Sequence, residues 1–129
     1  MKVIICFEGD KNIGLWELFT KHRKGFSHVF VIHYDVDNDI WIKFEYATQR
    51  FVIDTYKGED ADWLVAYLAN NCICLDCEVD PSPILAPRLT YCVSFAKHFV
   101  GIRKPFILTP YQLYCELIKK GAKRIFEPA

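Results

Sequence analysis

Hydrophobic and polar residues repeat along this chain with two periods, one typical of strands and the other typical of helices. Residues 3–7 are apolar and rich in β-branched side chains, so they predict a first strand. Apolar residues then recur near helical spacing over residues 12–24, with Asn12 as a possible cap and Gly25 as the stop. A strand followed by a helix is therefore expected at the start of the chain.

Three strands are expected next, close together in the sequence. Residues 26–34 and 50–56 are rich in β-branched and aromatic side chains, and residues 40–47 alternate between apolar and polar positions. A cluster of acids and Asn at residues 35–38 marks a turn, and residues 48–49 form a second short break. Strands joined by breaks this short predict an antiparallel meander.

The second half of the chain predicts mainly helices. Acidic residues open a short helix at residues 60–69, and a strand is expected at residues 71–79. A further helix is expected at residues 90–100, and Thr109 followed by Pro110 marks the start of the last helix. This order of elements predicts an α+β fold, in which an antiparallel meander sheet packs against helices.

Composition narrows the class of protein. The chain has 129 residues, of which 52% are hydrophobic, so a single domain over residues 1–129 can bury a core without disulfides. The 16 basic residues balance the 16 acidic ones, and the lack of a basic excess argues against nucleic-acid binding. No apolar segment is long enough to span a membrane, and the apolar run before Glu8 is too short for a signal peptide.

The chain contains 6 cysteines, mostly within apolar segments. An even number can indicate disulfides in a secreted protein, but without a secretion signal we expect reduced, buried thiols in a reducing compartment. The spacing Cys72-x-Cys74-x-x-Cys77 invites comparison with a zinc site. Structural zinc needs four ligands and the chain has no matching second pair, so we expect no metal and no cofactor.

Cys92 differs from the other thiols in its expected position within a helix. It lies two residues after Thr90, the expected N-cap, and therefore in the first helical turn. Backbone N–H groups in that turn have no partner within the helix, so they favour a thiolate and can help to form an oxyanion hole. Cys92 is therefore either a nucleophile or a helix-face thiol packed in the core.

A cysteine nucleophile needs a base, and His28 at the start of a predicted strand is the preferred candidate. If Tyr34 faces Asp39 across the turn, His28 lies opposite Glu45 on one face of the sheet, with Cβ atoms about 5 Å apart. A carboxylate at that distance can orient the imidazole.

Other residues compete for these roles. Three further histidines are present: His22, His33 and His98. His33 is expected to face the other side of its strand, because it lies five residues after His28. Glu45 could instead be a solvated acid paired with Lys43 or Arg50, so its role stays open from the residues alone.

Several segments taken together resemble a known superfamily. They are FSHVFVIHY, the acidic turn after it, IWIKFEYA and LTYCVSFAKHFVGI. In this order they resemble the permuted branch of the NlpC-type papain-like superfamily, where the histidine strand precedes the cysteine helix, as in the lecithin retinol acyltransferase group. The resemblance covers about residues 3–122, and the part after Cys92 also resembles small bacteriophage proteins of this type. It implies a circularly permuted papain-like fold with Cys92 as nucleophile, His28 as base and Glu45 as the third member.

Two functions from different classes follow. One is a cysteine hydrolase or acyl-transfer enzyme that acts on an amide, peptide or thioester bond, with a peptide or acyl substrate. The other is a non-catalytic use of the same fold, as a structural or interaction component in a phage particle or against a host protein. Either function is expected in the cytoplasm of a bacterial host or in association with a virion.

Overall fold

The computed structural model of the chain describes residues 1–9, 25–47, 50–79 and 92–128. Within these residues the strands are β1 (Lys2–Glu8), β2 (His28–Asp35), β3 (Ile40–Ala47), β4 (Arg50–Tyr56), β5 (Cys72–Glu78) and β6 (Lys123–Phe126). The helices are α2 (Glu59–Asn71), α3 (Cys92–Val100) and α4 (Pro110–Lys119). The α+β class predicted from the sequence is confirmed.

The strands form one antiparallel sheet in the order β4-β3-β2-β1-β5-β6. The predicted meander is confirmed as β2-β3-β4. β1 lies between β2 and β5, so the first strand of the chain is central and pairs with segments far away in sequence. Its position inside the sheet explains why it is almost wholly apolar.

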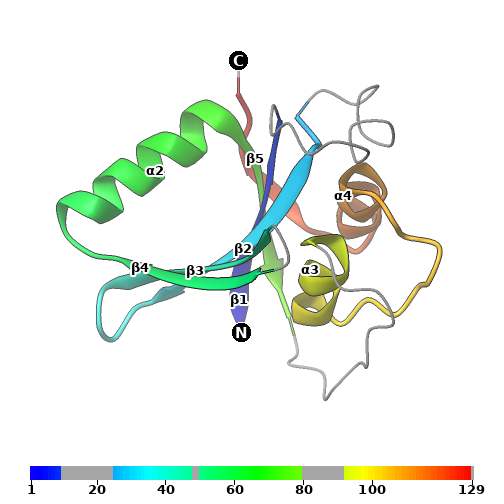
Figure 1. Cartoon of the computed structure of the whole chain (residues 1–129), viewed down its shortest axis with the longest axis horizontal. Helices are drawn as coiled ribbons and strands as arrows, with labels where there is room; N and C mark the ends of the chain where they lie inside the picture. Colours follow the sequence, from blue (N-terminus) through cyan, green and yellow to red (C-terminus); the bar gives the residue numbers. More distant parts are fainter. Residues whose placement is uncertain (10–24, 48–49, 80–91, 129) are drawn as a thin grey trace.

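Helices cover both faces of the sheet. α2 lies against one face, whereas α3 and α4 lie against the other (Figure 1). Side chains of β1 alternate accordingly, because Ile5 and Phe7 join the core with α3 and α4, and Cys6 joins the core with α2. Apolar layers on both faces of the central strands therefore hold the two sets of helices in place.

The start of α4 is as the sequence predicts. The Thr109 side chain accepts a hydrogen bond from the Gln112 backbone, and the Gln112 side chain accepts one from the Thr109 backbone. Pro110 occupies the first turn, where a missing N–H costs nothing. This capping box adds about 1 kcal/mol to the stability of the helix end.

β6 was not predicted. It has four residues, with Lys123 and Arg124 at its start, and its polar composition gives no strand signal. Its pairing with β5 is irregular, with a register shift between Cys74 and Leu75. The strand forms because β5 leaves an edge that the end of the chain can reach.

The turn between β2 and β3 lies one residue later than predicted, and the register differs by two. Tyr34 pairs with Trp41 rather than with Asp39, and Asp35 pairs with Ile40. Asp35 ends β2 and its carboxylate accepts hydrogen bonds from the backbone of the turn, at Asp37 and Asn38. These bonds move the turn to residues 36–39.

This correction leaves the predicted face unchanged. Phe30 lies opposite Glu45 once the observed register, Val31 with Phe44, is extended by one residue. His28 then lies two residues from the position opposite Glu45. Because side chains in a strand alternate with a period of two, His28 and Glu45 still share a face.

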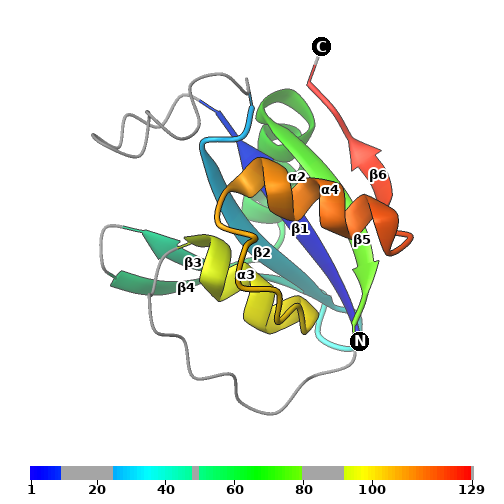
Figure 2. The ribbon, with the colours of Figure 1, turned by 90° about the vertical axis from the view of Figure 1, so that its right-hand side faces the viewer.

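β2 and β3 diverge at the end of the sheet where His28 lies. Their pairing runs from Asp35 with Ile40 to Val31 with Phe44. Beyond that point β2 follows β1, where His28 pairs with Glu8, and β3 follows β4. Figure 2 shows the two strands separating, with α3 in front of the opening.

Two expectations fall outside the described residues: the helix at 12–24 and the N-cap at Thr90. Among the helices that the structure does describe, none combines the length and apolar character needed to cross a membrane.

Candidate active site

His28 is the first residue of β2 and is almost fully buried, with 2% of its surface exposed. Its Nε2 atom lies 2.8 Å from Oε1 of Glu45, which is also buried. The structure therefore brings together two of the residues singled out from the sequence. The contact is diagonal across the diverging strands and not directly opposite as predicted.

Glu45 also pairs with Lys43, the alternative that the sequence left open. Lys43 Nζ lies 2.8 Å from Oε2 of Glu45, and 4.7 Å from the centre of the Phe30 ring. One carboxylate oxygen thus contacts the lysine and the other contacts the imidazole. Because both contacts are made at once, the lysine fixes the carboxylate that orients His28.

Cys92 is the third residue of the site predicted from the sequence. It is the first described residue of α3, is 6% exposed, and lies close enough to His28 for its interaction with the imidazole to raise the pKa of His28. α3 packs on the opposite face of the sheet from α2, in front of the opening between β2 and β3 (Figure 2).

The two partners change the acidity of His28. Burial lowers the pKa of the imidazole, but the hydrogen bonds to Cys92 and Glu45 and their charges outweigh burial and raise the pKa to about 9. At neutral pH the ring therefore carries its proton. A protonated imidazole in contact with a thiol stabilises the thiolate, which is the reactive form of cysteine.

Two residues of this site were missed from the sequence. Glu8 ends β1 directly opposite His28 and is 3% exposed. Tyr67 in α2 donates a hydrogen bond of 2.5 Å from its hydroxyl to Oε2 of Glu8, and burial together with this bond raises the pKa of Tyr67. An acid directly after the apolar run of β1 was the available signal, but it required knowing that β1 pairs with β2.

The remaining histidines take no part in this cluster within the described residues. His33 faces the other side of β2, as predicted from its spacing, and its Nδ1 lies 2.9 Å from the backbone oxygen of Lys2. His98 lies in the last turn of α3, at the opposite end of the helix from Cys92. His22 lies outside the described residues.

The cysteines of β5 do not converge on one point. Cys72 and Cys74 belong to the core beneath α2, whereas Cys77 belongs to the core beneath α3 and α4. This split agrees with the strand alternation expected from the sequence. Cys74 instead meets Cys6 of β1, with 3.4 Å between the sulfur atoms.

The chain matches no protein-family model, no curated protein and no solved structure. Any function must therefore be inferred from the geometry of the site.

Proposed function

We propose that this protein is a cysteine hydrolase or acyl-transfer enzyme with a permuted papain-like arrangement. The observation that carries the proposal is the continuous series of side chains from Cys92 through His28 to Glu45. A nucleophile, a base and an orienting carboxylate in hydrogen-bond contact are the elements of a catalytic triad. All three residues are more than nine-tenths buried, so bulk water does not compete for these bonds.

The reaction would proceed in two steps. The Cys92 thiolate attacks the carbonyl carbon of an amide or thioester, and the bond to the leaving group breaks as protonated His28 gives it a proton. Water or another acceptor then attacks the acyl-cysteine, with neutral His28 taking its proton. Cys92 leaves as the thiolate, which restores the starting pair.

The first turn of α3 would stabilise the charge that develops on the carbonyl oxygen. Cys92 is the first described residue of α3, and the sequence predicts that this helix starts at Thr90. Backbone N–H groups in such a first turn have no helical partner. Donors of this kind contribute about 3 to 4 kcal/mol to transition-state stabilisation in acyl transfer. Glu45, fixed by Lys43, would hold the ring of His28 in position through both steps.

The order of elements supports the permuted arrangement. The histidine strand β2 precedes the cysteine helix α3, and an antiparallel sheet lies between α2 and the other two helices. This is the order expected from the resemblance to the permuted NlpC-type papain-like branch. A peptide, isopeptide or lipid acyl group is the proposed substrate class, in a bacterial host or with a phage particle.

Selective alkylation tests the proposal directly. The rate of iodoacetamide labelling at each cysteine would be followed by mass spectrometry from pH 5 to pH 9, with EDTA present. His28→Ala is compared with His33→Ala, a matched control on the same strand whose side chain faces away. Fast labelling of Cys92 near pH 6 that is lost only in His28→Ala supports the pair, whereas ordinary labelling in all three proteins overturns it.

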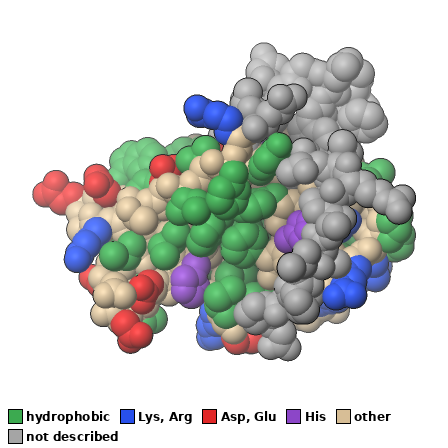
Figure 3. All heavy atoms as spheres, turned by 60° about the horizontal axis from the view of Figure 1, so that its bottom comes forward, with side chains coloured by type: hydrophobic (Ala, Val, Ile, Leu, Met, Phe, Trp, Pro, Cys, Tyr) green, Lys and Arg blue, Asp and Glu red, His purple; other side chains and the backbone are tan. Residues whose placement is uncertain are grey.

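A second function, an interaction module, is favoured by one observation. Hydrophobic side chains gather on the face formed by β4 and α3 (Figure 3). Phe51 and Ile53 of β4 are each about half exposed, and Phe51 contacts Phe95 of α3. If Cys92 behaves as an ordinary thiol, this surface becomes the first place to look for a protein partner.

A further inference from the structure

Three buried side chains from three neighbouring strands meet at the proposed triad, and two of them are members of it. They are Glu8 of β1, His28 of β2 and Glu45 of β3. Each offers one ligand atom, and the three atoms lie within 4.8 Å of one another. Their exposed fractions are only 3%, 2% and 7%. Two carboxylates and an imidazole gathered in the core carry a large desolvation cost, which Lys43 and the proton of His28 offset when no ion is bound.

The two carboxylates are held in place by outer partners. The hydroxyl of Tyr67 donates to Oε2 of Glu8, and the ammonium group of Lys43 contacts Oε2 of Glu45. In metal sites, hydrogen bonds of this kind orient the ligands and fix which oxygen faces the ion. In this cluster they leave Oε1 of Glu45 directed at Nε2 of His28.

We infer that Glu8, His28 and Glu45 form a binding site for a divalent transition metal such as Zn²⁺. One imidazole nitrogen and two carboxylate oxygens suit Zn²⁺ or Mn²⁺ better than Ca²⁺, which takes six to eight oxygen ligands. Metal–ligand bonds of about 2.1 Å place tetrahedral ligand atoms about 3.4 Å apart. Nε2 of His28 and Oε1 of Glu45, which are 2.8 Å apart as a hydrogen-bonded pair, would therefore separate slightly around the ion, with water completing its coordination.

Metal binding and the proposed catalysis are mutually exclusive states of the same imidazole. The ion takes the lone pair of Nε2 and releases the proton that Nε2 shares with Glu45. With Zn²⁺ bound, His28 can no longer be oriented by Glu45. Zn²⁺ is thus a reversible inhibitor of the proposed enzyme, although the site itself does not depend on that function.

Isothermal titration of EDTA-treated, buffer-exchanged protein with Zn²⁺ tests the site. Wild-type protein is expected to bind one ion, and Glu8→Gln to bind at least about 10-fold more weakly. Asp54→Asn is the matched control, because Asp54 lies opposite Lys43 on the same sheet face but is exposed. Its affinity should equal that of wild type. No saturable binding, or equal affinity in Glu8→Gln, overturns the inference.

Two further measurements test the ligand set independently of Glu8→Gln. Tyr67→Phe keeps every ligand and should weaken Zn²⁺ binding by about 10-fold with little change in the melting temperature, even if Glu8→Gln fails to fold. Co²⁺ absorption reports on thiolate ligands, because the six free cysteines could also bind metal. A sulfur-to-cobalt charge-transfer band that persists in Glu8→Gln would assign the ion to thiols and overturn the inference.

The outcomes also separate this site from the proposed enzyme. If Cys92 labels as an ordinary thiol while Zn²⁺ binding is lost in Glu8→Gln, the catalytic proposal fails and the metal site stands. If Cys92 reacts fast in EDTA but no ion binds, the metal site fails and the catalytic proposal stands.

Discussion

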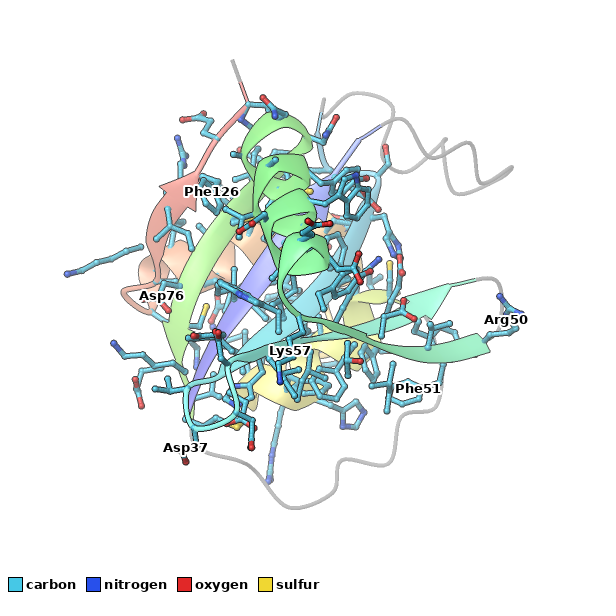
Figure 4. The ribbon with its side chains drawn as sticks, turned by 90° about the vertical axis from the view of Figure 1, so that its left-hand side faces the viewer. Asp37, Arg50, Phe51, Lys57, Asp76 and Phe126 are labelled. Carbon is cyan, nitrogen blue, oxygen red and sulfur yellow. The ribbon has the colours of Figure 1, made fainter. Side chains whose placement is uncertain are left out.

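Two of the cysteine environments in this molecule lie on opposite sides of the sheet. Beneath α2, three fully buried thiols form a cluster: Cys6, Cys72 and Cys74. At the start of α3, Cys92 is also buried but contacts an imidazole. Figure 4 looks onto the α2 face, where Asp76 marks β5, the strand that carries two of the clustered thiols.

The neighbours, and not burial itself, distinguish the two environments. For Cys6, burial raises the pKa of the thiol, and for Cys72 and Cys74 the hydrogen bonds between thiols and burial together raise the pKa. The charge of Lys43 lowers the pKa of Cys6 and Cys72, but the other causes outweigh it. Cys92 instead has as its neighbour an imidazole whose pKa is raised, and this difference in neighbours is the basis of the reactivity proposed for Cys92.

The largest expected effect is on the labelling pattern. At pH 7, Cys92 should react with iodoacetamide at least about 100-fold faster than the cluster thiols, because Cys92 has an imidazolium partner and they do not. Cys92→Ala should therefore remove the fast phase, and Cys74→Ala should leave it intact. Stopped-time mass spectrometry measures both, and a fast phase carried by Cys6 or Cys74 would contradict the comparison.

The next effect is on stability as pH rises. The pKa of His28 is raised from 6.5 to about 9. The stabilisation that protonated His28 gives to the folded state is therefore complete below pH 6.5 and is lost as pH increases through 9. The free energy of unfolding should fall by up to about 3 kcal/mol over this range. Urea unfolding at several pH values measures the decrease, which His28→Asn should largely remove.

A third effect concerns the pKa of His28 itself. Removing either partner should lower it, by about one to two pH units, with Cys92→Ala acting more strongly than Glu45→Gln. NMR of the imidazole nitrogens follows the titration directly. Equal pKa values in wild type and Cys92→Ala would show that the thiol does not share a proton with the ring.

The smallest effect is structural. Cys74→Ser places a hydroxyl among buried thiols and apolar side chains, and should reduce the free energy of unfolding by about 1 to 2 kcal/mol. Cys115→Ser is the control on α4, where the thiol is half-buried, and should change stability by less than about 0.5 kcal/mol. Neither change should alter labelling of Cys92.

Local patterns predicted most of the elements, and long-range pairing accounts for what was missed. Thr109 and Pro110 are local signals, and α4 begins where they indicate. The partner of Glu8 depends on β1 lying beside β2, which no local signal contains. Predicting that Cys92 lies near His28 required still more long-range information, since their proximity depends on the divergence of β2 from β3.

His28 and Glu45 show why a wrong register can still select the right pair. The predicted register was off by two residues, yet strand alternation places both side chains on the same face for any even error. An error of one residue would have separated them. The face of the sheet on which each side chain lies could therefore be predicted, whereas the diagonal contact itself could not.

The two edges of the sheet differ in how they resist self-association. β6 is short, irregularly paired and begins with Lys123 and Arg124, features that discourage another strand from adding. β4 is the other edge of the sheet that the structure describes, and it has seven residues, with Phe51 and Ile53 exposed. Aggregation at high concentration is expected to start at β4, so Ile53→Lys is the substitution to try first when concentrated samples are needed.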